Sequence, residues 1–77
     1  MEKAYLGVDI GSISTKGVVL DADNNILAID YLWTEGDPIG ATKRLAKSLE
    51  SQLDAGRYQI VAAGTTGSAR KLVGTML

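Results

Sequence analysis

The sequence contains no cysteine and no histidine, and each absence excludes a class of chemistry. Without cysteine, the chain can form no disulfide framework and cannot itself ligate an iron–sulfur cluster. The two commonest zinc ligands are missing as well. A chain of 77 residues buries only about 60% of the surface that its unfolded form exposes, so an independent core is marginal. We therefore expect one small unit.

The sequence also lacks an excess of charge and long apolar runs. Eight basic and nine acidic residues give a net charge of −1, which provides no electrostatic attraction to nucleic acid or to an anionic membrane. No apolar stretch approaches the ~20 residues that a membrane-spanning helix requires. Residues 1–5 lack the basic-then-apolar layout of a signal peptide. We expect a cytoplasmic protein with no nucleic-acid or membrane partner.

Hydrophobic patterning predicts an α/β chain with the element order β-β-β-α-β-α. Three short, β-branched runs are joined by short turns, which favours antiparallel pairing. A fourth strand follows a helix, so it is expected to enter the same mixed sheet parallel to a strand already there. The expected strands are Tyr5–Ile10, Lys16–Leu20, Ile26–Trp33 and Tyr58–Ala63.

The clearest helix begins after Asp37, which is a good N-cap, and has Pro38 at its first position. Three leucines at four-residue spacing predict its buried side. Gly56 fits the C′ position that ends a helix. The sequence therefore predicts a helix that runs from Pro38 almost to Gly56.

A last helix is expected to begin after Ser68, which would cap it. Its apolar residues continue to the end of the sequence, and a complete domain seldom finishes on an exposed apolar turn. We expect residues 1–77 to be the N-terminal part of a longer domain, or this end to be covered by a partner. The apolar residues concerned are Leu72, Val73, Met76 and Leu77.

Two other segments have simple interpretations. Asp21–Asn25 is expected to be a hairpin turn, because a calcium loop would need glycine and glutamate where Ile26 and Leu32 stand. Tyr31 and Trp33, at the end of the third strand, are candidate interface anchors or core residues. We expect them to lie in the core.

The residues that carry chemistry lie between Asp9 and Lys16. A polyphosphate needs backbone N–H groups, small residues, hydroxyls and a cation, and a nearby carboxylate to hold Mg²⁺, usually through water. Lys16 can supply the cation and Asp9 the carboxylate. The alternative is an ordinary hairpin turn, with Asp9 only capping it. The candidate phosphate ligands in the turn are Gly11, Ser12, Ile13, Ser14 and Thr15.

Two common nucleotide signatures are absent. The sequence has no G-x-x-x-x-G-K-[ST] stretch, which excludes a P-loop. It has no G-x-G-x-x-G after the first strand, so the dinucleotide-binding fingerprint is missing too. A cradle made by a strand, a turn and a second strand remains.

The stretch from Gly7 to Leu20, GVDIGSISTKGVVL, resembles the first phosphate motif of the superfamily that contains actin, Hsp70 chaperones and sugar kinases. It is most similar to the BadF/BadG/BcrA/BcrD ATPase family, whose members open with G-[IV]-D-[IV]-G-S-x-x-[ST]-K. That family includes the activators of 2-hydroxyacyl-CoA dehydratases and of benzoyl-CoA reductase. The resemblance implies a ribonuclease-H-like, actin-like ATPase fold, and it covers essentially the whole chain.

A second, looser match is Ala63–Arg70, where these activators carry an A-T-G-Y-G-R-like loop after the fourth strand. The Tyr-Gly pair of that loop is missing here, and a G-T-T-G-S-A-R form is expected in larger relatives. The alternative is that the glycines only permit a turn. The match adds a loop of candidate nucleotide ligands, Gly64, Thr65, Thr66 and Gly67.

The resemblance implies ATP binding and hydrolysis, with ATP held between two lobes of which this chain supplies part of one. Asp9 would act in catalysis by orienting Mg²⁺ and its waters. In the activators, hydrolysis is coupled to electron delivery from an iron–sulfur cluster to a CoA-ester dehydratase or reductase. Such a cluster would be held by the parent protein outside this chain. The isolated fragment is expected to be inactive, and a homodimer of the parent is left open.

Two alternatives to this function are kept. The first is a fragment of a sugar or acetate kinase, a phosphotransferase. Such a kinase would tend to offer a carboxylate near the end of the fourth strand, and Ile60–Gly64 contains none, which favours hydrolysis. The second is a non-catalytic, actin-like assembly module.

Overall fold

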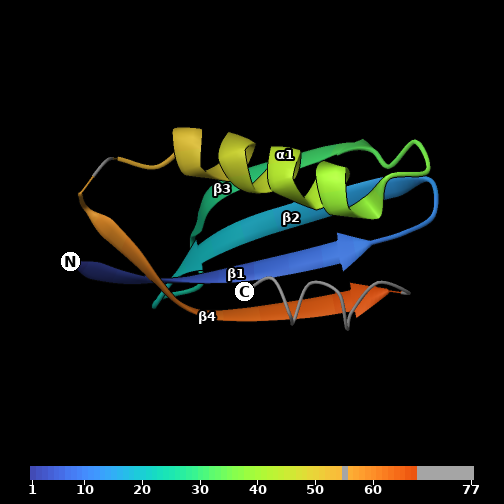
Figure 1. Cartoon of the computed structure of the whole chain (residues 1–77). Helices are drawn as coiled ribbons and strands as arrows, with labels where there is room; N and C mark the ends of the chain where they lie inside the picture. Colours follow the sequence, from blue (N-terminus) through green and yellow to red (C-terminus); the bar gives the residue numbers. More distant parts are fainter. Residues whose placement is uncertain (55, 68–77) are drawn as a thin grey trace.

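The computed structural model describes residues 1–54 and 56–67. In this part of the chain, four strands form one sheet, and one helix lies across a face of that sheet (Figure 1). The predicted order β-β-β-α-β is confirmed, and the last helix, expected from Ser68 onward, lies outside the described residues. The elements are β1 (Glu2–Ile10), β2 (Ser14–Asp21), β3 (Ile26–Trp33), α1 (Pro38–Ser51) and β4 (Tyr58–Gly67).

The sheet is mixed, as predicted, with the strand order β3-β2-β1-β4. Short turns join β1, β2 and β3, which pair antiparallel. β4 follows the helix and pairs parallel to β1. The carboxyl ends of β1 and β4 therefore meet at one end of the sheet, beside the turn that joins β1 to β2 (Figure 1).

The core forms between α1 and the sheet. Leu45 and Leu49 are 1% and 2% exposed and pack against β2 at Gly17. A Cβ atom at Gly17 would lie 2.9 Å from Leu45 Cδ2 and 2.9 Å from Leu49 Cδ1, so the close approach of helix and strand requires glycine. The other buried apolar residues are Ala4, Val8, Ile10, Val19, Ala28 and Ala41.

The start of α1 is as predicted, but its end is not. Asp37 is the N-cap and accepts a hydrogen bond from the N–H of Gly40 at 3.0 Å. The helix ends at Ser51, and Gln52 is its C-cap, so the prediction that Gly56 ends it is wrong. The side chain of Gln52 contacts β3. Its amide accepts a hydrogen bond from the N–H of Ile29 at 3.2 Å and donates one to the carbonyl of Ile29 at 3.1 Å.

Gly56 has another role. It has a φ of +79°, and it lies in the turn that leads into β4, where the N–H of Arg57 donates to the carbonyl of Asp54 at 3.1 Å. The glycine thus permits a left-handed turn rather than a helix end.

Of the helices in the described part of the chain, none has the length and apolar character needed to cross a membrane.

The segment Gly64–Gly67 belongs to β4, so its prediction as a loop is wrong. β1 continues to Ile10 and offers a partner to each of these four residues, so the ladder runs on from Gly7 opposite Gly64 to Ile10 opposite Gly67. A local run of glycine and threonine indicates a loop. Here, pairing with β1 keeps the run in the extended conformation of a strand.

The hairpin between β2 and β3 is closed by Asp21–Asn25, as predicted. The Asp21 carboxylate accepts from the N–H groups of Asp23 and Asn25, both at 2.9 Å, and from the Asn25 side chain at 3.0 Å. Asn24 has a φ of +65°, the left-handed conformation that asparagine tolerates. The Asp21 carboxylate therefore stabilises the turn through hydrogen bonds within it.

The face of the sheet opposite α1 carries exposed apolar side chains. Tyr31 and Trp33 are 56% and 58% exposed, so the prediction that they lie in the core is wrong. Their ring centroids are 6.1 Å apart at an interplanar angle of 61°. Alternation along β3 turns these residues away from the helix, and Ile29, on the same side, is 61% exposed. In the described part of the chain, the helix α1 contacts β2 and β3 from the other face of the sheet.

Candidate phosphate-binding site

The turn between β1 and β2 is tighter than predicted. The N–H of Gly11 donates to the carbonyl of Ser14 at 2.9 Å, which leaves Ser12 and Ile13 at the tip. Ser14 and Thr15 belong to β2 instead of the turn. Both tip residues are exposed, Ile13 by 69%. Their two backbone N–H groups donate to no other described residue, whereas the N–H of Gly11 is used to close the turn.

Thr15 points into the protein. It is fully buried, and its hydroxyl lies 2.9 Å from the hydroxyl of Thr34. The hydroxyl of Thr34 also donates to the carbonyl of Gly11 at 2.8 Å, and the N–H of Thr34 donates to the carbonyl of Ile13 at 2.8 Å. Thr34 therefore supports the turn from inside, and Thr15 contacts Thr34, while Ser12 and Ile13 face solvent.

Sequence reasoning did not single out Thr34. It follows β3 directly and is 2% exposed, although it precedes the exposed turn residues Glu35 and Gly36. No motif contains it, and a lone threonine at a strand end has no distinctive signal. Its three contacts with the β1–β2 turn come from pairing between segments about 20 residues apart, which only the fold reveals.

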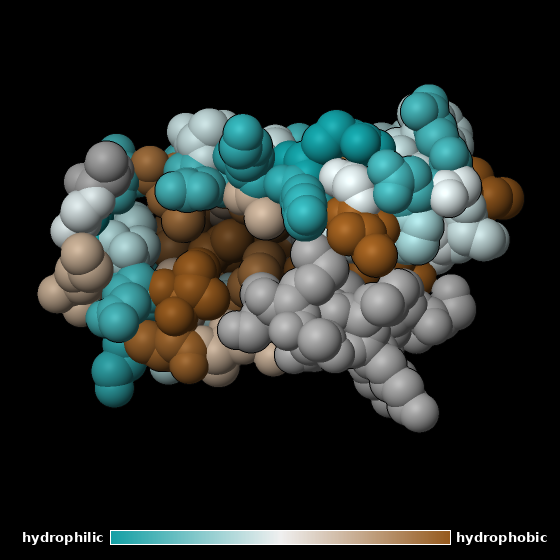
Figure 2. Space-filling model, in the orientation of Figure 1, coloured by the Kyte–Doolittle hydropathy of each residue, from teal (hydrophilic) through white to brown (hydrophobic). Residues whose placement is uncertain are grey.

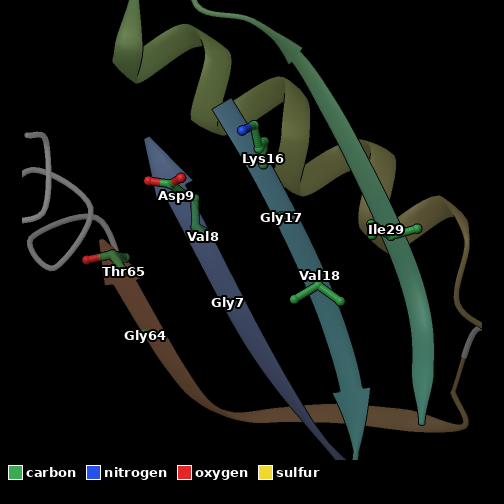
Figure 3. A pocket seen from close by; sticks show the side chains of 9 residues that line it. All are labelled: Gly7, Val8, Asp9, Lys16, Gly17, Val18, Ile29, Gly64 and Thr65. Atoms are coloured by element: carbon green, nitrogen blue, oxygen red, sulfur yellow. The ribbon is translucent and has the colours of Figure 1, made fainter. Parts of the chain in front are cut away.

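Asp9 and Lys16 are brought together by strand register. They stand opposite each other in β1 and β2, on the face of the sheet away from α1, and both are exposed. Directly opposite residues of an antiparallel pair have Cβ atoms about 5 Å apart. Asp9 also stands beside Thr66 of β4, and Lys16 beside Tyr31 of β3. The carboxylate and the ammonium therefore lie on neighbouring strands, near the β1–β2 turn (Figure 3).

An open depression of about 540 Å³ lies below these two charges (Figure 3). Gly7 and Gly64 are neighbours in register, so part of its floor is bare backbone. A Cβ atom at Gly64 would meet no atom within 4 Å. Gly64 and Thr65 thus share a surface with Asp9 and Lys16, although they lie in a strand. The lining residues are Gly7, Val8, Asp9, Lys16, Gly17, Val18, Ile29, Gly64 and Thr65.

The predicted site residues therefore fall into three groups. Ser12 and Ile13 form the exposed tip of the turn, flanked by Gly11 and Ser14. Thr15 lies behind the turn, in the core. The residues around the depression, which extends from the turn along the sheet, are Asp9, Lys16, Gly64 and Thr65, and Thr66 and Gly67 continue β4 opposite Asp9 and Ile10.

The donor set at the depression is compatible with magnesium bound mainly by other ligands. Within residues 1–54 and 56–67, no group of three or more histidine, cysteine or acidic residues could enclose a metal ion. Asp9 is the carboxylate that lines the depression. Mg²⁺ commonly takes one or two carboxylates and fills its remaining positions with water and substrate phosphates, so one carboxylate is sufficient here.

Comparison with known proteins adds no assignment. No model of a known protein family matches the chain, and no curated protein matches it significantly.

Proposed function

We propose that this chain supplies the first phosphate-binding hairpin of an actin-like ATPase domain with a ribonuclease-H-like fold. The observation that carries the proposal is the β1–β2 turn. It exposes the N–H groups of Ser12 and Ile13 at its tip, and Asp9 and Lys16 stand opposite each other just behind it. The strand order β3-β2-β1-β4 and the parallel entry of β4 after a helix support the fold.

In this proposal, the chain's residues position phosphate. The N–H groups of Ser12 and Ile13 donate to the β- and γ-phosphates, and the hydroxyls of Ser12 and Ser14 assist. Lys16 offsets phosphate charge. Asp9 would hold a magnesium ion through its waters, and the ion would supply charge neutralisation during phosphoryl transfer. Phosphoryl transfer depends mainly on positioning and charge stabilisation, which are the properties that these residues offer.

Several features of the complete protein belong to the same proposal. ATP lies between this lobe and a second one, and the protein is a cytoplasmic ATPase like the activators of 2-hydroxyacyl-CoA dehydratases. An iron–sulfur cluster, where the parent has one, is ligated outside this chain, because the sequence has no cysteine. The protein that receives the electron after ATP hydrolysis is then a CoA-ester dehydratase or reductase.

A non-catalytic assembly module is the second candidate. The exposed Ile29, Tyr31 and Trp33 favour it, because aromatic side chains on an uncovered face are common in interfaces. An assembly module of this kind keeps its partner when Asp9 is changed, whereas an ATPase loses turnover.

The test is phosphate release from Mg·ATP by the complete protein, measured for the wild type and for Asp9→Asn. We expect the variant to lose activity by about 100-fold or more, the scale of removing a group that stabilises charge in the transition state. Asp23→Asn is the matched control, because it makes the same chemical change in the exposed β2–β3 turn, and it should keep wild-type turnover. Equal turnover in wild type and Asp9→Asn would remove Asp9 from the mechanism. Absence of hydrolysis in the wild type would favour the assembly module.

A further inference from the structure

We infer that Thr34 is a positioning residue, which aims the backbone N–H of Ser12, in the β1–β2 turn, at the bound phosphate. This inference rests on the proposed function and adds to it a residue of the connection between β3 and α1. Thr34 lies outside the predicted motif, after β3, and reaches the turn only through the fold.

The hydrogen bonds of the Thr34 hydroxyl have definite directions. Its hydroxyl has one proton, which it donates to the carbonyl of Gly11 at 2.8 Å. In the 2.9 Å contact between the two threonine hydroxyls, Thr15 must then be the donor and Thr34 the acceptor. The N–H of Thr34 donates to the carbonyl of Ile13 at 2.8 Å. Two carbonyl groups of the turn are thus held by one residue that is 2% exposed.

Holding these carbonyls fixes the direction of two N–H groups. All the described peptide bonds are trans, and in a trans peptide the C=O of one residue and the N–H of the next point in opposite directions. The carbonyl of Gly11 points toward Thr34, so the N–H of Ser12 points away from it. By the same argument, the N–H of Ser14 points away from Thr34, because the carbonyl of Ile13 points toward it.

Thr34 is itself held from the other side. Its carbonyl accepts the N–H of Asp37 at 3.0 Å, and Asp37 caps α1 through the N–H of Gly40. Glu35 and Gly36, between them, have positive φ values of 53° and 72°, which close this short turn. The position of Thr34 is therefore fixed by the start of the helix and does not depend on the β1–β2 turn alone.

The hydroxyl is the group to remove. Thr34→Val keeps the shape of the side chain but leaves the carbonyl of Gly11 without its buried donor. Thr34→Ser restores that donor. Thr15→Val is the matched control, because it removes a buried hydroxyl from the same pair but keeps the bond from Thr34 to Gly11.

The first measurement is the dissociation constant of Mg·ATP for the complete protein. We expect Thr34→Val to weaken binding about tenfold, equivalent to the net loss of one buried hydrogen bond. Thr34→Ser and Thr15→Val should stay within about threefold of the wild type. If Thr34→Val does not fold, Thr34→Cys keeps the size and a weak donor, and it should show an intermediate loss. Wild-type binding by a folded Thr34→Val or Thr34→Cys variant would overturn the inference.

The second measurement needs no nucleotide. Amide hydrogen exchange at Gly11 and Thr34 reports the two hydrogen bonds that close and hold the turn, and the amide of Val8, in the middle of β1, is the internal reference. Thr34→Val should raise exchange at Gly11 relative to Val8, and Thr34→Ser should not. Unchanged exchange at Gly11 would overturn the inference even if ATP binding falls. Failure of the wild type to bind Mg·ATP would instead refute the proposed function, and with it the role of Thr34 in binding.

Discussion

At the scale of single residues, the glycines of this chain have different physical roles. Gly17 faces α1, and its missing side chain makes room for Leu45 and Leu49. Gly64 faces open space at the floor of the depression. One glycine therefore serves packing, whereas the other leaves a surface uncovered.

This contrast gives a paired prediction. Gly17→Ala should lower the free energy of unfolding by about 1–3 kcal/mol, because its methyl group would lie 2.9 Å from two buried leucine methyls. Gly64→Ala should change it by less than about 0.5 kcal/mol, since the new methyl meets nothing within 4 Å. Urea denaturation measures both. Equal losses in the two variants would contradict the packing role of Gly17.

The sequence predicted local features of the residues better than their surroundings. Asp37 and Pro38 identify a helix start by their own chemistry, and the structure confirms it. Thr15 was expected among the phosphate ligands, yet it is fully buried against Thr34. Whether a threonine faces solvent or core depends on strand register, which is set by pairing with residues distant in sequence.

At the scale of elements, local and non-local signals disagree most in β4. Gly64 to Gly67 read as a loop, but β1 extends the ladder to Gly67. At the end of α1, the side chain of the C-cap residue Gln52 bonds the backbone of Ile29 in β3, a partner that is distant in sequence. The order of the elements was predictable from periodicity, whereas these boundaries depend on neighbours in space.

The β2–β3 hairpin gives a prediction about pH. Hydrogen bonds from Asn25 and then from Asp23 hold the pKa of Asp21 below its usual 3.8. A carboxyl whose pKa is lowered in the folded state contributes stability above its unfolded pKa and loses that contribution as the pH falls through the folded pKa. The difference in urea midpoint between wild type and Asp21→Asn should therefore be full at pH 6 and shrink below 3.8. A difference that stays constant with pH would contradict this role.

At the scale of the whole molecule, the one helix in residues 1–54 and 56–67 lies over only part of the sheet. α1 lies over β2 and β3, and an apolar groove of about 320 Å³ remains between the helix and β4. Figure 2 shows this region as an apolar hollow beside the polar outer side of α1. The opposite face carries the exposed aromatic residues. Both surfaces are suited to further protein, in agreement with the proposal of a larger domain. The groove is lined by Leu6, Val19, Ala46, Leu49, Glu50, Leu53, Tyr58 and Ile60.

Trp33, the single tryptophan, tests this arrangement. It is 58% exposed, so acrylamide should quench its fluorescence readily in the 77-residue chain. In the larger protein that we propose, with every other tryptophan replaced by phenylalanine, quenching should fall clearly, because the proposal places additional protein over this face of the sheet. Equal quenching in the two proteins would show that the face stays open to solvent.

The side-chain amide of Gln52 makes the two edges of the sheet different for the pairing of a further strand. By bonding both the N–H and the C=O of Ile29, it imitates one residue of a neighbouring strand and occupies that side of β3. β4, at the other edge, contains neither a charged residue nor a proline. These residues commonly prevent an edge strand from pairing with a strand of another chain. A fifth strand, from whichever chain, would therefore join beside β4, two strands away from the hairpin that carries Lys16 and next to the strand that borders Asp9. Enlargement of the sheet would then begin at β4, the strand that pairs with β1 and borders the candidate site.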